Sequence, residues 1–183
     1  MDSQRRTFLR AAGLVLAWMT PIRSSAQEVK DTLPAPGDLF VRVGDDAMIP
    51  LTPDDVPFDG RGVMVWPLGA GDVLKNATPN SRIVLARLNP ASLSEATRQR
   101  AVDDIVAYSS ICTHSGCDVD ESLGDSSTFF CSCHGSIFDP RDSGAAIGGP
   151  APRALPALPL KLDGGRLVVA APFTTSPGFG PAR

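Results

Sequence analysis

Histidine, tyrosine and basic residues are scarce in this sequence, which has two His and one Tyr among 183 residues. The chain has 17 Lys and Arg against 20 Asp and Glu. The resulting net charge of −3 argues against a basic surface for binding nucleic acid. No apolar run is as long as the roughly 20 residues of an ordinary membrane-spanning helix. The sequence also lacks a phosphate-binding loop and a dinucleotide fingerprint. What remains for chemistry is a small set of four Cys and two His.

The composition is otherwise that of an ordinary soluble globular protein. Hydrophobic residues make up 43% and charged residues 20%, which argues against disorder as the main state. The length fits one domain with accessory segments. Seventeen Gly and 17 Pro favour turns and short strands over a helical bundle.

Residues 1–26 read as a targeting segment. Arg5 and Arg6 precede an uncharged stretch of 12 residues, and a run of small residues ends at Ala26. The pattern resembles bacterial twin-arginine signals, which implies export to the periplasm by the Tat translocase and cleavage after Ala26. An uncleaved anchor and an amino-terminal helix of the domain are the alternatives. Cleavage removes four basic residues and one acid, and the resulting net charge of −6 favours a positively charged docking partner.

The rest of the chain predicts an all-β fold, either an antiparallel sandwich or a barrel. We expect a linker at 27–38, a domain at 39–171 and an irregular tail at 172–183. Strands are expected at 39–43, 63–66, 82–88, 104–108, 128–130, 158–162 and 166–170. Pro67 should end the second of these strands, Gly164-Gly165 should join the last two as a hairpin, and Tyr108 should lie in the core. Ser92–Asp104 is the one predicted helix.

All Cys and His residues fall within 23 consecutive positions, in two groups. The groups are Cys112, His114 and Cys117, then Cys131, Cys133 and His134. Three assignments compete: a zinc site with two Cys and two His, a pair of structural disulfides, or a [2Fe-2S] cluster with two thiolate and two imidazole ligands. A zinc site usually takes two Cys from one segment and two His from the other, whereas here each group offers both. Two disulfides leave both His without a role.

The surrounding residues single out one family. Cys112-Thr113-His114-Ser115-Gly116-Cys117 and Cys131-Ser132-Cys133-His134-Gly135-Ser136, with 13 residues between them, closely resemble the motifs of Rieske iron–sulfur proteins. The resemblance covers mainly residues 104–162. It implies a Rieske-like domain whose cluster-binding subdomain, about residues 108–153, consists of loops and one short helix.

The resemblance also implies one [2Fe-2S] cluster per chain and its ligands. Cys112 and Cys131 would ligate one iron, and His114 and His134 the other. The remaining two Cys match positions that form a disulfide between the cluster loops in some branches of the family: Cys117 and Cys133. Free thiols at these two positions are the alternative.

Two further features resemble parts of the family that shield or tune the cluster. Gly148–Pro152 is similar to the loop that covers the cluster, with Gly149 and Pro150 as its stiff centre. Ser136 matches a position whose hydroxyl donates a hydrogen bond to the cluster, whereas Phe138 stands where high-potential members carry Tyr. Rieske ligation places the potential at about −150 to +300 mV. Phe138 predicts a value below that of a Tyr-bearing relative.

The implied function is one-electron transfer to and from partner proteins, because both His residues are used as ligands and no catalytic set remains. The first partner class is the large subunit of an exported molybdenum oxidoreductase. Small subunits of the arsenite-oxidase type resemble this chain in signal, length and Phe138, although many carry a bulkier residue at Gly135. The second is a cytochrome b and c complex, quinol–cytochrome c reductase, whose Rieske subunit usually has Leu at the position of Ser115. A free-standing periplasmic shuttle is the third.

Overall fold

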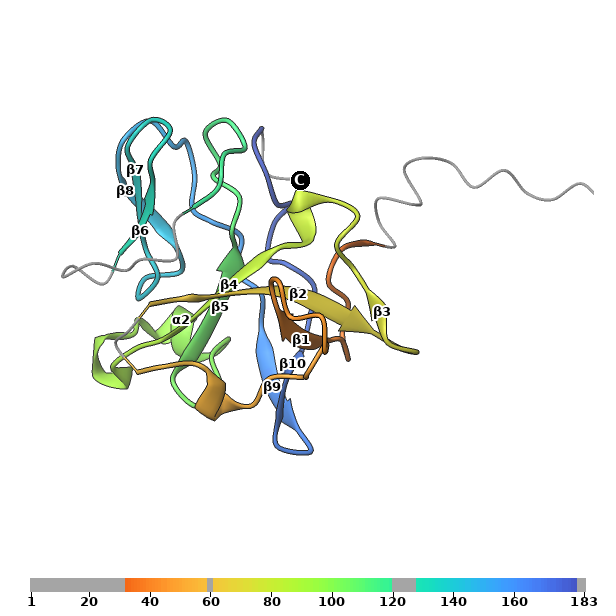
Figure 1. The fold of residues 1–183 in the computed structure, drawn as a ribbon. Coiled ribbons are helices and arrows are strands. Elements are labelled where there is room, and N and C mark those ends of the chain that lie inside the picture. Colours follow the sequence, from red (N-terminus) through yellow and green to blue (C-terminus); the bar gives the residue numbers. More distant parts are fainter. Residues whose placement is uncertain (1–31, 59–60, 120–127, 181–183) are drawn as a thin grey trace, which may run out of the picture.

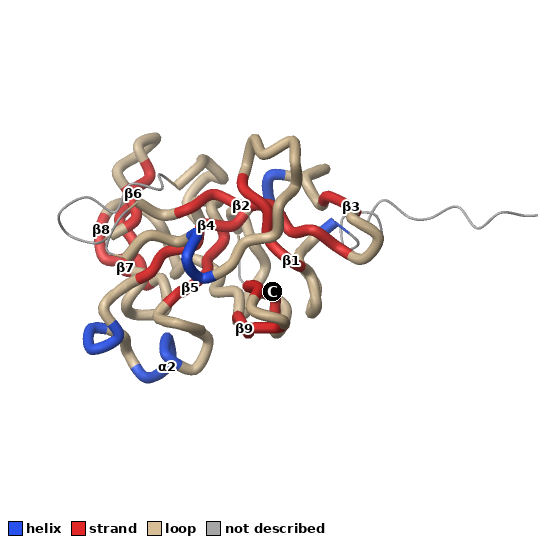
Figure 2. The backbone as a smooth tube through the Cα atoms, turned by 60° about the horizontal axis from the view of Figure 1, so that its bottom comes forward, coloured by secondary structure: helices blue, strands red, loops and turns tan. Residues whose placement is uncertain are grey.

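Two antiparallel sheets of short strands make up the fold (Figure 1). The computed structural model describes residues 32–58, 61–119 and 128–180. The strands are β1 (Leu39–Arg42), β2 (Val63–Gly69), β3 (Val73–Leu74), β4 (Ile83–Arg87), β5 (Ile105–Ser109), β6 (Phe129–Cys131), β7 (Ser136–Asp139), β8 (Ala145–Gly148), β9 (Leu160–Asp163) and β10 (Arg166–Val169). In the described residues, helical structure is confined to short pieces (Figure 2): α2 (Glu95–Arg98) and 3-10 turns at Pro53–Asp55, Pro79–Ser81 and Pro90–Ser92.

The larger sheet curls into a barrel. Its strand order is β5-β4-β2-β1-β10-β9, with β3 beside β2. The chain just before β9 returns to the edge of β5, where Leu158 N donates to Ala107 O and Ser109 N donates to Pro156 O, both at 2.9 Å. One continuous segment, residues 156–163, therefore joins the two ends of the strand order. The predicted all-β antiparallel class is confirmed, in its barrel form.

Alternating residues of the barrel strands form an apolar interior. A strand directs successive side chains to opposite faces, so every second residue points inward. Ile83 and Leu85 of β4 do so, and so do Ile105 and Ala107 of β5. The cluster also contains Phe40, Leu51, Val56, Val63, Val65, Leu158, Leu160, Leu167 and Val169.

A second core lies on the outer face of β4 and β5. The intervening residues, such as Val84 and Val106, pack there against the smaller sheet, β6-β7-β8. Tyr108 is buried in this core as predicted, with its ring edge-on to Phe129 at 6.1 Å between centroids. The Tyr108 hydroxyl donates to Pro140 O at 2.8 Å, and burial raises its pKa far above the usual range. Because β4 and β5 are covered on both faces, they form a well-packed surface on which the smaller sheet lies.

The predicted helix at Ser92–Asp104 is confirmed only over four residues, and its predicted extent is wrong. Only α2 is helical there; the Ser94 side chain caps it by accepting from Thr97 N. The chain then turns back as a tight hairpin, in which Val102 pairs with Ile105 across two residues with positive φ, Asp103 and Asp104 (φ 48° and 64°). Asp tolerates this left-handed conformation better than most residues, so a turn replaces the last helical turns.

The strand predictions are mostly confirmed, with instructive exceptions. β2 does not end at Pro67 but continues to Gly69. On one side of β2, residues before Pro67 pair with β4 and residues after it pair with β3. Pro67 lies between these two pairings, so its lack of a backbone N–H removes no hydrogen bond from either. Gly164 and Gly165 have positive φ and join β9 to β10 as a two-residue hairpin, as predicted. β7, β8 and the short β3 were not expected.

Part of the predicted linker packs on the barrel. Gly37 N donates to Val169 O at 2.9 Å, and Asp38 forms an ion pair with Lys75 at 2.6 Å. The predicted signal at 1–26 lies outside the described residues. Within the described ranges, no helix has both the length and the apolar character needed to cross a membrane.

Candidate metal centre

The two Cys/His groups lie on two neighbouring hairpin loops. In the first, Ile111 pairs with Asp118, Cys112 N donates to Cys117 O at 2.8 Å, and Gly116 N donates to Cys112 O at 3.0 Å. The second is the β6–β7 turn, where Cys131 pairs with Ser136. We name these the first loop (residues 112–117) and the second loop (residues 131–136). Both are short and hydrogen-bonded across their base, so each presents its side chains in a defined direction.

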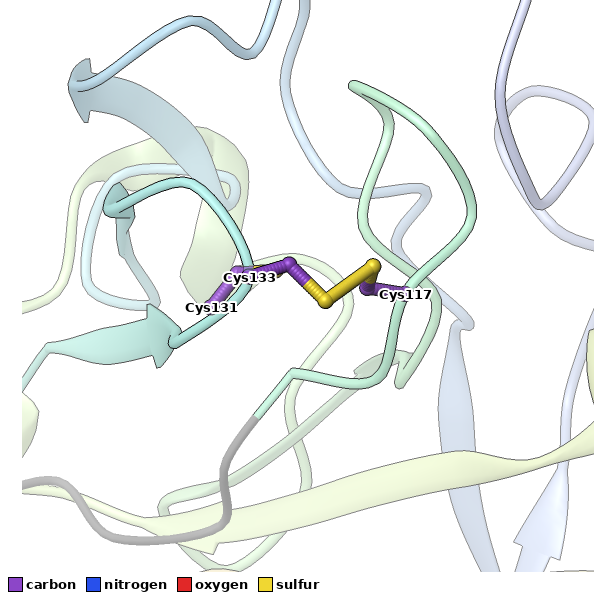
Figure 3. A group of neighbouring side chains, drawn as sticks. All are labelled: Cys117, Cys131 and Cys133. Carbon is purple, nitrogen blue, oxygen red and sulfur yellow. A yellow bond between two sulfur atoms is a disulfide. The ribbon is translucent and has the colours of Figure 1, made fainter.

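A disulfide joins the two loops (Figure 3). Cys117 and Cys133 are bonded, with their Cα atoms 6.5 Å apart, as the resemblance implied. The sulfur of Cys131 lies within 4.8 Å of both disulfide sulfurs. Cys112 and Cys131 are free thiols, so the assignment of all four Cys to two disulfides is wrong.

The four predicted ligands form an inner pair and an outer pair. Cys112 and Cys131 are each 1% exposed and belong to the second core. His114 is half-buried and His134 is exposed, with their ring centroids 4.7 Å apart at 86°. The structure therefore brings the two thiols together at the base of the loops and the two imidazoles together at the surface.

Unpaired polar atoms and a raised thiol pKa mark the space between the loops. Burial raises the pKa of the Cys131 thiol, and the adjacent Cys112 thiol raises it further. His114 Nδ1 and Ser136 Oγ are buried without a hydrogen-bond partner among the described residues. Buried polar atoms are nearly always paired, so an orphaned imidazole nitrogen and an orphaned hydroxyl beside two free thiols indicate that a bound group completes this site. A metal cation would stabilise both thiolates and accept the Nδ1 lone pair.

The loop after β8 packs its backbone against the second loop. Gly149 has φ +74°, and a Cβ placed on it would lie 2.6 Å from Ser136 Cα, well inside van der Waals contact. Only Gly permits this approach, and the exposed Pro150 follows it. The same segment reaches the first loop, because the buried Thr113 hydroxyl donates to Arg153 O at 2.7 Å. The predicted covering loop therefore contacts the second loop, and Arg153, directly after it, contacts the first.

The donor set and this arrangement agree with the comparison with known families. A sequence model of the Rieske [2Fe-2S] domain matches residues 68–159, about half of the chain. The chain belongs to the Rieske family. It contains a Rieske domain, the kind that binds a [2Fe-2S] cluster, and a zinc module is no longer needed to explain the two Cys/His groups.

Rieske relatives are found in more than one kind of complex. A protein of Haloferax mediterranei named "Putative respiratory nitrate reductase subunit Rieske" is 37% identical over 124 residues, 67% of this chain and 53% of that protein. The cytochrome bc1 complex Rieske iron–sulfur subunit of Streptomyces lividans is 34% identical over 137 residues, 72% of this chain and 78% of that protein. This chain thus spans about half the length of the first relative. Among solved structures, the plasma membrane Rieske protein of Synechocystis PCC 6803 is similar at 28% identity with a TM-score of 0.40, covering 54% of this chain and 85% of that one.

Two contributors to the site were missed from the sequence, Thr113 and Arg153. Thr113 stands inside the ligand motif but is neither Cys nor His, and Arg153 follows the covering loop. Their hydrogen bond joins residues 40 positions apart. In the sequence, only the position of Arg153 directly after Gly148–Pro152 indicated a role at the site. That position does not show which ligand loop Arg153 contacts.

Replacing Gly149 by Ala should destabilise the protein by about 2–4 kcal/mol, since the new methyl group overlaps Ser136 and the residue keeps a left-handed φ. The measurement is the free energy of unfolding in denaturant. Gly164→Ala is the matched control: Gly164 also has positive φ, but no atom lies within 4 Å of the position of its Cβ. The control should lose only about 1–2 kcal/mol, from backbone strain alone. Equal losses in the two variants would contradict close packing at Gly149.

Removing the disulfide should both destabilise the fold and release iron faster. The two Cys are 16 positions apart, and closing a loop of that size contributes about 3 kcal/mol. We expect this loss in Cys117→Ser/Cys133→Ser, together with faster transfer of iron to a chelator. Treating the unchanged protein with a thiol reductant should reproduce both effects. Unaltered stability and iron release in the double variant would show that the disulfide does not hold the loops together.

Proposed function

We propose that this chain is an exported one-electron subunit of, or shuttle for, a larger oxidoreductase, acting in the periplasm. The observation that carries the electron-transfer role is the meeting of two buried free thiols with an orphaned imidazole nitrogen between disulfide-joined loops. Support for export comes from the twin-arginine pattern at Arg5 and Arg6 and from a disulfide that suits an oxidising compartment. Support for a larger complex comes from relatives that are named as subunits.

Four residues would hold the cluster in this proposal. The buried thiolates of Cys112 and Cys131 would ligate one iron, and His114 and His134 would ligate the other, His114 through Nδ1. A cluster so ligated supplies one-electron redox chemistry at high potential, because two neutral imidazoles replace two negative thiolates. The exposed His134 makes the imidazole end the place where a partner comes nearest.

Other side chains of the site exclude water and set the potential. Ser136 has a buried hydroxyl free to donate toward the space between the ligands, and such a bond stabilises the added electron. Phe138 is fully buried on the same face of β7 and has no hydroxyl to add a second bond. The backbone of Gly149 packs against Gly135 and Ser136 of the second loop, which leaves less room for water there.

The proposed partner is the large subunit of a molybdenum oxidoreductase of the arsenite-oxidase type. Ser115 is exposed next to His114 and places a hydroxyl where a dock for an apolar quinol would need an apolar side chain. The second candidate is quinol–cytochrome c reductase. It is favoured by the cytochrome bc1 subunits among the relatives.

The test is purification of the tagged full-length chain from the periplasmic and membrane fractions of the cells that make it, followed by metal analysis. Molybdenum in a large co-purifying protein would support the proposal. Haem b and c proteins from the membrane would overturn it in favour of quinol oxidation. Zinc without iron and acid-labile sulfide would contradict the electron-transfer role itself.

The Ser136 hydroxyl should raise the midpoint potential. Ser136→Ala should lower the midpoint by roughly 60 mV, which is tenfold in a one-electron equilibrium constant. Phe138→Tyr should raise the midpoint potential. Phe138 lies in the same core as Cys112 and Cys131, so the added hydroxyl would be placed near the cluster. Ser132→Ala, at an exposed position of the second loop, is the control and should leave the potential unchanged. A redox titration followed by EPR measures all three, and an unshifted Ser136→Ala would refute the tuning role.

A further inference from the structure

The C-terminal tail (residues 172–180) continues the surface around the ligand loops. As predicted, it contains no strand or helix in the described residues, yet it is firmly attached. Thr174 N donates to Ala157 O at 2.9 Å, and Ala157 N donates to the Thr174 hydroxyl at 3.0 Å. Figure 1 shows the tail, in dark blue, rising beside the green first loop on the side of the barrel where β6–β8 lie.

Arg153 holds the end of the tail. Its guanidinium donates to three tail carbonyls, those of Ser176 at 3.0 Å, Gly178 at 2.7 Å and Gly180 at 3.1 Å. A fourth bond goes to the Thr175 hydroxyl at 3.4 Å. The carbonyl of Arg153 accepts from Thr113 in the first loop, so one residue fixes the tail and a ligand loop relative to each other. The burial that this requires lowers the pKa of Arg153.

The hydrogen bonds from Arg153 to the tail place an exposed aromatic ring at the ligand loops. Phe179 is 71% exposed, the most exposed large apolar side chain among the described residues. Its ring lies against Gly116, since a Cβ placed on Gly116 would be 3.1 Å from Phe179 Cδ1. A large apolar side chain held on the surface by its neighbours has already lost the conformational freedom that binding would otherwise cost.

The four segments that lie around the predicted ligands contain no acidic residue, no Lys and no Arg. They are residues 112–117, 131–138, 144–152 and 172–180. At the 20% charged residues of the whole chain, 32 residues would carry about six. The cores of protein interfaces are depleted of charge and enriched in aromatic residues, which is the composition found here. These four segments therefore supply no charge that would attract a positive partner, and Asp118, directly after the first loop, is paired with Arg82.

Resting on the proposed electron-transfer role, we propose that the tail is part of the docking surface and that Phe179 is its anchor. The partner is a redox protein that presents an uncharged, apolar recess for this ring beside its own redox group. Phe179 supplies the apolar contact that Ser115 on the adjoining first loop does not. Arg153 acts as a positioning residue, which holds Phe179 in the docking conformation.

The experiment is stopped-flow electron transfer between the cluster-loaded full-length chain and the redox protein that co-purifies with it. Phe179→Ala should lower the second-order rate constant about tenfold, with the midpoint potential and EPR spectrum unchanged. Phe58→Ala removes another exposed Phe (54% exposed) outside the four uncharged segments and should have no effect. The rate constant of the unchanged chain should vary little with salt, because the four segments of the proposed docking surface contain no Asp, Glu, Lys or Arg.

Arg153→Gln should lower the rate constant as Phe179→Ala does, and the double variant should be no slower than either single one, since both remove the same contact. Arg166→Gln, at an exposed Arg of the barrel, is the control. An unaffected rate in Phe179→Ala, a shifted midpoint that accounts for the slower rate, or a steep fall with salt would each overturn the proposal. These outcomes leave the electron-transfer role intact, whereas absence of a [2Fe-2S] EPR signal in the unchanged chain would refute that role instead.

Discussion

The proposed site depends on one constraint: the two thiols and two imidazoles proposed as ligands come from different hairpins and must meet at one small, rigid cluster. Each hairpin is short and closed by backbone hydrogen bonds, which fix the direction of its own side chains. Nothing within either hairpin sets the distance from one hairpin to the other. Contacts between loops do that. The Cys117–Cys133 disulfide joins the two loops, Gly149 lets a third backbone pack against the second loop, and a hydrogen bond from Thr113 joins the first loop to Arg153.

The barrel gives these loops a stable base because β4 and β5 are buried on both faces. One face completes the barrel interior, and the other carries the second core, to which Cys112 and Cys131 themselves belong. The ligand thiols are thus part of the packing that attaches the smaller sheet. His114 is half-buried and His134 is exposed, so the imidazole half of the site is nearer to solvent than the thiol half.

The chemistry could be predicted from the sequence because its residues are local: six Cys and His within two short motifs, and a Gly-Pro segment beyond them. Strand β5 and the Gly164-Gly165 hairpin could also be predicted, because strand-forming and turn-forming residues act over only a few positions. The helix at Ser92–Asp104 is shorter than predicted because the Asp103-Asp104 turn overrode helical spacing. The position of Phe179 could not be predicted, because it depends on hydrogen bonds from Arg153 to carbonyls more than 20 positions away, which no local pattern encodes.

Pulsed EPR of the reduced protein, labelled with ¹⁵N only in histidine, tests the central claim most directly. The chain has just two His, so every labelled ring nitrogen belongs to His114 or His134. Two strong nitrogen couplings to the cluster are predicted, with one of them lost in His114→Cys. A spectrum without histidine nitrogen couplings would contradict the account, because the cluster would then be held by other ligands.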